Sequence, residues 1–144
     1  YIGIAFGKIV RAEYESDTCC LRLYGASAAD FENIWFDYFD LGRDYGAIKK
    51  KLTAEDRIMA DAVEHGSGIR ILNQEKWETL LSFIISQNNN IPRIKKCIES
   101  LACVMGEKAG SYNGRDYYIL PSPEVLADAD IEDLAPCRLG YRAK

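Results

Sequence analysis

The chain has 144 residues, of which 48% are hydrophobic and 28% are charged, and this balance excludes an intrinsically disordered polymer. Its longest apolar runs, within residues 80–85, are interrupted by serine and fall short of the roughly 20 residues that cross a bilayer, so we expect no membrane contact. A net charge of −4 disfavours a general polyanion-binding face, although cations gather in residues 88–96 and 134–144.

The cysteines and the single histidine limit the metal and redox chemistry. The chain has five cysteines without a C-x-x-C pair, namely Cys19, Cys20, Cys97, Cys103 and Cys137. Only His65 could add an imidazole ligand, so we predict reduced thiols, no metal site and no cofactor. No signal peptide is visible. The chain starts on a strand-like run and stops directly after Gly-Tyr-Arg, which leads us to expect part of a longer cytosolic protein.

The first part of the chain has the pattern of a small β region. Residues 1–24 alternate apolar and polar side chains in three short runs, which predicts antiparallel strands with turns at Gly7-Lys8 and at residues 15–18. After Gly25 the apolar period becomes helical, and Ser27 and Asp30 have the spacing of a capping box. The sequence therefore predicts an α+β fold, with an antiparallel β region over residues 1–26 and a mostly helical region over residues 27–144.

Further helices follow in chain order. Thr53-x-x-Asp56 predicts a helix start, and His65-Gly66 predicts its end. A longer helix begins at about Gln74 and ends near residues 87–90.

Pro92 can open the next helix, and Gly106 closes it. Asn113-Gly114 predicts a hairpin turn, whereas Ser122 and Asp130-x-x-Asp133 predict the starts of two short helices.

The first distinctive segment lies at the junction of two predicted helices. Asn88, Asn89 and Asn90 precede Arg93 by about one helical turn, and no phosphate loop or nucleophile elbow competes with them as a site. Asparagine amides at a loop tip can satisfy the edge of an unpaired base or bind phosphate oxygens. The alternative is that the triplet only ends one helix and starts the next.

The second distinctive segment is residues 139–144. Tyr141, between Gly140 and Arg142, could wedge its ring between base pairs while the guanidinium holds a phosphate or an orphaned base. The alternative is a buried tyrosine beside a solvated arginine. Elsewhere, residues 49–51 are three lysines that we interpret as a solvated helix end, and Trp35 and Tyr38 as core residues.

Both segments resemble a known family. Residues 83–94, Phe-Ile-Ile-Ser-Gln-Asn-Asn-Asn-Ile-Pro-Arg-Ile, resemble the Ser-Phe-Ile…Asn-Asn-Asn-Ile-x-Arg-Ile signature of the 8-oxoguanine DNA glycosylases of the helix-hairpin-helix superfamily. Residues 139–144, Leu-Gly-Tyr-Arg-Ala-Lys, resemble a second segment of that family, in the same order and spacing. The resemblance extends more loosely over most of the chain. It implies a helical region of the helix-hairpin-helix glycosylase type.

The resemblance also implies a function. It implies base-excision repair by an 8-oxoguanine DNA N-glycosylase with apurinic/apyrimidinic lyase activity, without metal or cofactor. The expected partner is double-stranded DNA with an oxidised purine opposite cytosine, and we expect a monomer in the cytoplasm, associated with a nucleoid or placed in a nucleus. Two alternatives stay open: a non-catalytic module that binds damaged DNA, and a glycosylase for alkylated purines from the same superfamily.

The resemblance assigns roles to individual residues. Asn88 fills the gap left by the extruded nucleotide and pairs with the orphaned cytosine, which Arg93 also contacts. Tyr141 wedges into the base stack, and Arg142 adds a second guanidinium. Asn89 and Asn90 shape the junction. From charge alone we add four candidate phosphate contacts, namely Lys95, Lys96, Arg138 and Lys144.

The family's catalytic residues have no counterpart in these 144 residues. In the family, a lysine of the helix-hairpin-helix attacks the sugar C1′ and a downstream aspartate supports the reaction, and both lie beyond the last segment that matches here. We therefore expect no catalytic residue in this chain, and neither glycosylase nor lyase activity from it alone.

Overall fold

The computed structural model describes residues 1–143 and divides the chain into two compact units. One unit combines Tyr1–Ala26 with the chain from Gln74 onward, and the other is Ser27–Asn73. The α+β class predicted from the sequence is confirmed. The predicted domain division at residues 26 and 27 stays a prediction, since the contacts assign the β region and the later helices to one unit.

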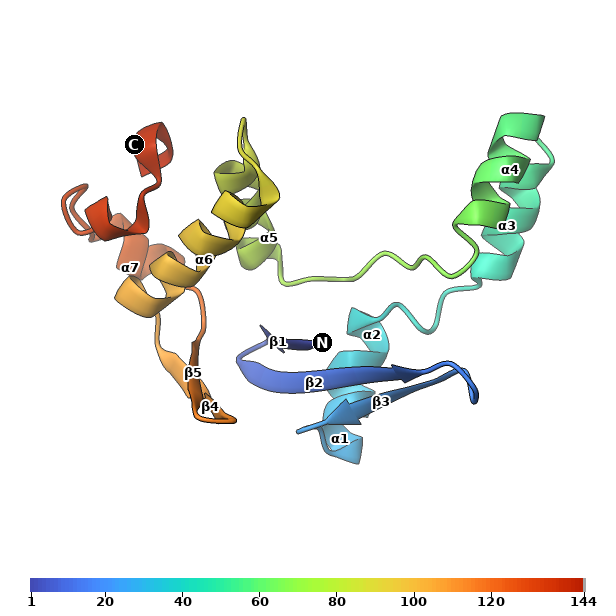
Figure 1. Ribbon diagram of the computed structural model, residues 1–144, viewed down its shortest axis with the longest axis horizontal. Coiled ribbons are helices and arrows are strands. Elements are labelled where there is room, and N and C mark those ends of the chain that lie inside the picture. Colours follow the sequence, from blue (N-terminus) through green and yellow to red (C-terminus); the bar gives the residue numbers. More distant parts are fainter. Residues whose placement is uncertain (144) are drawn as a thin grey trace. The chain divides into compact units, whose positions relative to one another are not determined.

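The first unit begins with an antiparallel meander (blue in Figure 1), in which β1 (Ile2–Ala5), β2 (Lys8–Glu15) and β3 (Cys20–Tyr24) pair in sequence order. The two-residue turn between β1 and β2 has positive φ at both Phe6 (51°) and Gly7 (70°), which matches the twist of the flanking strands. The alternation of apolar residues predicted these strands because each strand turns one face inward, where Ala5 and Val10 are buried.

The same unit continues with two helices and a hairpin. Helix α5 (Lys76–Ser86) and helix α6 (Ile91–Met105) pack on each other, and β4 (Lys108–Tyr112) pairs with β5 (Arg115–Tyr118). Asn113 and Gly114 both have positive φ, 50° and 75°, so the predicted hairpin turn is confirmed. Gly106 ends α6 as predicted, and its N–H donates to the carbonyl of Ala102.

The end of this unit is less regular than the sequence predicted. Ser122 caps the short helix α7 (Pro123–Ala127) as expected, with its hydroxyl accepting from the N–H of Val125. The prediction of a helix starting at Asp130-x-x-Asp133 is wrong. The Asp133 carboxylate does accept from the N–H of Asp130 at 3.0 Å, but a turn follows, then the 3₁₀ helices Ala135–Cys137 and Gly140–Ala143. Pro136 lacks the N–H that a longer helix would need.

The core of the first unit joins α5 and α6 to the last turns of the chain. Its buried members are Ile85, Cys97, Leu101, Cys137 and Leu139. Leu101 and Cys137 are each 1% exposed. Because Leu139 lies in this core, the segment that carries Tyr141 and Arg142 is anchored next to the end of α5.

The second unit is helical. Ser27 and Asp30 form the predicted capping box at α1 (Ala28–Asp30), which continues through a π-helical segment (Phe31–Trp35) into α2 (Phe36–Tyr38). Trp35 is fully buried, and its ring contacts those of Tyr38 and Phe39, which confirms the prediction of a core position.

Two helices follow that pack on each other, α3 (Tyr45–Thr53) and α4 (Arg57–His65). Gly66 ends α4 as predicted. The predicted helix start at Thr53 is wrong. Its hydroxyl donates back to the carbonyls of Lys49 and Lys50, so Thr53 closes α3, and Asp56 alone caps α4 by accepting from the N–H of Met59 at 2.8 Å. Threonine can satisfy such carbonyls, while aspartate is a strong N-cap.

Asp40 connects the loop after α2 to the start of α3 and to the segment after α4. Its carboxylate accepts from the Tyr45 hydroxyl at 2.8 Å and pairs with Arg43 at 2.6 Å. The Tyr45 hydrogen bond, followed by the charge of Arg43, lowers the pKa of Asp40 below its usual value. The Asp40 carbonyl also accepts from Arg70 at 2.9 Å, which ties the end of the unit to the loop that follows α2.

Candidate nucleic-acid interface

The junction between α5 and α6 gives each asparagine of the triplet a different task. The Asn90 side chain accepts from the N–H of Arg93 at 3.0 Å and caps α6. The Asn89 amide donates to the carbonyl of Ile85 at 3.0 Å and satisfies the end of α5. Both residues therefore shape the junction, and the capping interpretation is confirmed for them.

Asn88 differs from its two neighbours. It lies at φ 47°, a left-handed conformation that asparagine tolerates better than most residues. Within the described residues its side chain makes no hydrogen bond, and it is exposed. A free amide on a fixed, exposed turn is suited to contact a ligand, although its role in binding DNA stays a prediction.

Residues 139–142 lie directly against this junction. The Arg142 guanidinium donates from Nε to the carbonyl of Gln87 at 3.1 Å and from Nη2 to the carbonyl of Asn88 at 3.1 Å. Its Nη2 also donates to Gln87, and its Nη1 donates to the carbonyl of Leu139 at 3.3 Å. The two segments singled out in the sequence, 54 residues apart, are therefore joined by one side chain.

Tyr141 contacts the same carbonyl, and we call the contacts of Tyr141 and Arg142 with the backbone of residues 87 and 88 the clasp. Its hydroxyl donates to the Gln87 carbonyl at 3.3 Å, and the Arg142 guanidinium lies 4.5 Å from its ring centroid. The side chain is 59% exposed, so the alternative of a buried tyrosine is wrong. These contacts hold an accessible aromatic ring next to the Gln87 carbonyl, one residue before Asn88, and the wedge role of the ring stays a prediction.

Arg93 and Arg138 also contact each other near the junction. The Arg93 guanidinium lies 3.5 Å from the Arg138 carbonyl, and the Cys97 sulfur lies 3.8 Å from the same oxygen. Arg138 has φ 54°, which is rare for a residue with a long side chain. Neither arginine pairs with a carboxylate among residues 1–143, so both charges remain available. Lys144 lies outside the described residues.

Sequence reasoning missed Gln87 and the structural part played by Arg142. Gln87 takes part through its backbone carbonyl, which accepts from both Tyr141 and Arg142, and a backbone acceptor leaves no trace in the side-chain pattern. The guanidinium has five N–H donors, and four are engaged with carbonyls of the chain. Arg142 is thus first a positioning residue for the junction.

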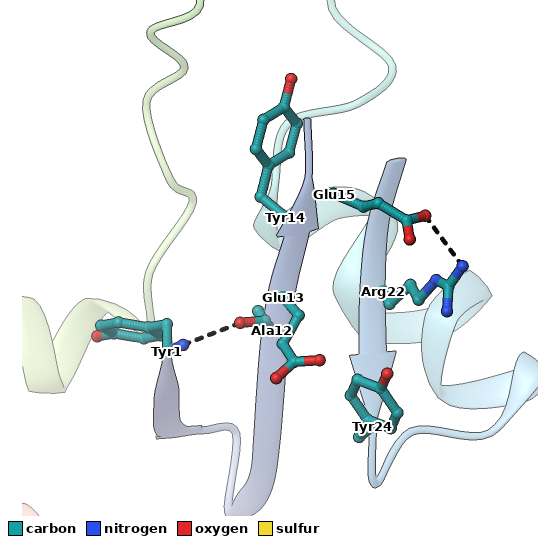
Figure 2. A pocket seen from close by; sticks show the side chains of 7 residues that line it. All are labelled: Tyr1, Ala12, Glu13, Tyr14, Glu15, Arg22 and Tyr24. Atoms are coloured by element: carbon teal, nitrogen blue, oxygen red, sulfur yellow. Dashed lines mark hydrogen bonds and ion pairs between the residues drawn. The ribbon is translucent and has the colours of Figure 1, made fainter. Parts of the chain in front are cut away.

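A hollow on the sheet is less suited to DNA. It has a volume of about 450 Å³ and is lined by Tyr1, Ala12, Glu13, Tyr14, Glu15, Arg22 and Tyr24 (Figure 2). Its single arginine pairs with Glu15 at 2.9 Å, and Glu13 pairs with Arg11. Two carboxylates and a neutralised cation disfavour a phosphate ligand here.

A larger groove, about 1220 Å³, runs between β1, α5, α6 and β5. Partial burial there raises the pKa of Glu78, with a smaller contribution from Glu75. Among residues 1–143 no group of three His, Cys, Asp or Glu side chains could hold a metal ion. In the same part of the chain, no helix is long and apolar enough to cross a bilayer.

The fold is similar to that of solved DNA glycosylases. A solved structure of MBOgg1 in complex with a low-affinity DNA ligand superposes with a TM-score of 0.91 at 48% sequence identity, covering 99% of this chain and 48% of that chain. The 8-oxoguanine glycosylase/lyase of Clostridium acetobutylicum, solved with double-stranded DNA containing cytosine opposite 8-oxoG, has a TM-score of 0.90 at 44% identity, with the same two coverages.

The chain belongs to the 8-oxoguanine DNA glycosylase family, because the model of that family's N-terminal domain matches residues 1–80. A curated relative, the N-glycosylase/DNA lyase of Saccharomyces cerevisiae, is 46% identical over 78 residues, which are 54% of this chain and 21% of that protein. The chain thus covers about half the length of the solved relatives, and its matched part covers about a fifth of this curated one.

Proposed function

We propose that this chain supplies the strand-opening and opposite-base contacts of an 8-oxoguanine DNA glycosylase and apurinic/apyrimidinic lyase. The substrate is duplex DNA with an oxidised purine opposite cytosine, and the process is base-excision repair. The observation that carries the proposal is the clasp, in which Tyr141 donates to the Gln87 carbonyl and Arg142 donates to the carbonyls of Gln87 and Asn88. We further propose a monomer that works in the compartment holding the genome, a nucleoid or a nucleus.

The clasp fits the energetics of base flipping. Extruding a nucleotide costs a few kcal/mol of stacking and pairing, which the protein must offset. The exposed Tyr141 ring can replace lost stacking, and aromatic contacts with bases contribute about 1–3 kcal/mol each. Because the ring is held by its own hydroxyl and by the guanidinium of Arg142, little side-chain freedom is lost on binding.

In this proposal, Asn88, Arg93 and Arg142 recognise the cytosine opposite the extruded nucleotide. The unpaired Asn88 amide offers both a donor and an acceptor to the Watson–Crick edge of cytosine. The exposed Arg93 guanidinium makes one long contact, with the Arg138 carbonyl, and pairs with no carboxylate among residues 1–143. Arg142 has one N–H left after its contacts with the chain. A site that satisfies cytosine leaves polar groups unpaired opposite adenine, and this penalty produces specificity.

Catalysis requires a nucleophile in addition to these binding contacts. The resemblance implies a lysine of a helix-hairpin-helix as the nucleophile, and no segment of these 144 residues matches that hairpin. We propose that the 144 residues alone neither release the base nor cut the strand. Incubation with a duplex carrying 8-oxoguanine, followed by measurement of free base and of borohydride-trapped protein–DNA adduct, tests this. Either product above the protein-free level contradicts the proposal.

The binding role is tested by fluorescence anisotropy with two duplexes that differ only in one abasic-site analogue. We expect tighter binding to the abasic duplex, and an approximately tenfold loss of this preference in Tyr141→Ala. Tyr141→Phe keeps the ring but removes the hydroxyl, so it should retain most of the preference. Equal affinity of the wild-type chain for both duplexes, or equal behaviour of the Ala and Phe variants, would contradict the wedge.

A further inference from the structure

A second hollow lies beside the junction, at the start of α6. We call it the α6 hollow; its volume is about 480 Å³, and it is lined by Asn90, Pro92, Arg93, Lys96, Cys97, Ser100, Cys137 and Arg138. Arg93, Lys96 and Ser100 share one face of α6 because they are three and four residues apart. Arg138 closes the opposite side, since its carbonyl is in contact with Arg93 and Cys97.

The charge of the α6 hollow is entirely positive. Arg93, Lys96 and Arg138 are cations, and none of the lining residues is acidic. Within the described part of the chain, no carboxylate forms a salt bridge with any of the three. The buried residues Cys97 and Cys137 also line the hollow. Burial raises the pKa of the Cys137 thiol, so this thiol adds no negative charge. Three uncompensated cations in one concave site attract an anion.

The backbone at Arg138 adds a second observation. With φ 54°, this position suits glycine or asparagine, yet it carries a long cationic side chain. The positive φ of this position therefore does not explain why it carries an arginine. Lys96 is likewise exposed on α6 and forms no salt bridge among residues 1–143, although the chain has a net charge of −4.

We infer that the α6 hollow binds a phosphodiester group of the DNA backbone, with Lys96 and Arg138 as the contacting cations. The start of α6, a helix of 15 residues, adds the positive end of its dipole to the same site. The inference rests on the proposed function, because it gives the DNA at the junction a phosphate anchor. Lys96 and Arg138 would fix the register of the strand without reading sequence.

The test compares the salt dependence of binding to the abasic duplex for the wild type, Lys96→Ala and Arg138→Gly. Alanine suits the helix, and glycine suits the left-handed backbone, so both variants should fold. Each lost phosphate contact lowers the slope of log K against log salt by about 0.9. The affinity deficit of each variant should therefore shrink about 3.5-fold when salt rises from about 50 to about 200 mM.

Lys76→Ala is the matched control. It removes the same charge from an exposed residue at the far end of α5, about 15 Å along the helix from the junction. Its slope should equal that of the wild type. If Lys96→Ala and Arg138→Gly match Lys76→Ala, the phosphate site is wrong.

A second probe, inorganic pyrophosphate followed by NMR shifts of the α6 amides, separates two sources of phosphate. Saturation by pyrophosphate, with no change in the DNA salt slope of the variants, would mean a site for free phosphates and would overturn the inference. Loss of slope in the variants without any preference for the abasic duplex would support the anchor and contradict the proposed function. No DNA binding by the wild-type chain would contradict both.

Discussion

Replacing Arg142 by alanine should release the junction between α5 and α6. The guanidinium donates to the carbonyl of Leu139, three residues earlier in the chain, and to the carbonyls of Gln87 and Asn88 at the junction. Each hydrogen bond from a charged donor contributes about 1.5–3 kcal/mol when fully formed. Because Arg142 is only half-buried and water can replace it, we expect a local cost of about 1–2 kcal/mol rather than the sum.

A cost of this size raises the open population of the junction by a factor of about 5–30. Native-state hydrogen exchange measures it at the amides of Arg93 and Ile94, which bond to Asn90. Their exchange should accelerate in Arg142→Ala, whereas amides around the buried Leu101 should change little. Arg142→Lys keeps the charge but lacks the planar fork, so it should rescue only part of the protection.

Arg115→Ala is the control for this experiment, because it removes an exposed arginine whose carboxylate partner, Glu99, lies 3.3 Å away and outside the junction. Unchanged exchange at Arg93 and Ile94 in Arg142→Ala, or full rescue by lysine, would refute the reasoning that the guanidinium fork holds the junction.

Two further predictions concern stability. A Cβ at Gly106 would lie 1.9 Å from the Ile119 carbonyl oxygen, so Gly106→Ala should lower the free energy of unfolding by about 3 kcal/mol or more in urea denaturation. Gly68→Ala, where nothing lies within 4 Å, should stay within about 0.5 kcal/mol, and equal effects of the two would argue against this close approach. The pKa of Asp40 is lowered in the folded state, so its contribution to stability is present above the unfolded pKa and is lost as pH falls through the folded one. Asp40→Asn should remove that part of the acid dependence, and an unchanged pH profile would contradict the assigned role of the Tyr45 hydrogen bond.

Local patterns predicted much of the fold. Period-two alternation identified the three strands of the meander, and Asn113-Gly114 identified the hairpin turn, because both depend on neighbouring residues only. The capping box at Ser27 and the cap at Ser122 were equally readable. The two wrong helix starts, at Thr53 and Asp130, show that the same capping pattern also occurs in turns and at helix ends.

The candidate site was predicted only in part. The segments around Asn88 and Tyr141 stood out by residue type and family resemblance, and the structure brings them together. What the sequence could not show is how they meet, because Arg142 contacts backbone carbonyls 54 and 55 residues away. Charge alone marked Lys96 and Arg138 as candidate phosphate contacts. The left-handed backbone of Arg138 and the concave shape of the α6 hollow could not be predicted, since both depend on tertiary packing around Cys97 and Cys137.

The most direct test of the account asks whether the junction reads the base opposite the lesion. Binding of abasic-analogue duplexes with cytosine or adenine opposite is compared for the wild type and Asn88→Gly, which keeps the left-handed backbone and removes only the amide. Asn113→Gly, at a second left-handed asparagine in the β4–β5 turn, is the control. We predict a preference for cytosine of about tenfold, which Asn88→Gly abolishes and Asn113→Gly preserves. Equal binding to both duplexes by the wild type, or a preference that survives Asn88→Gly, would contradict the account.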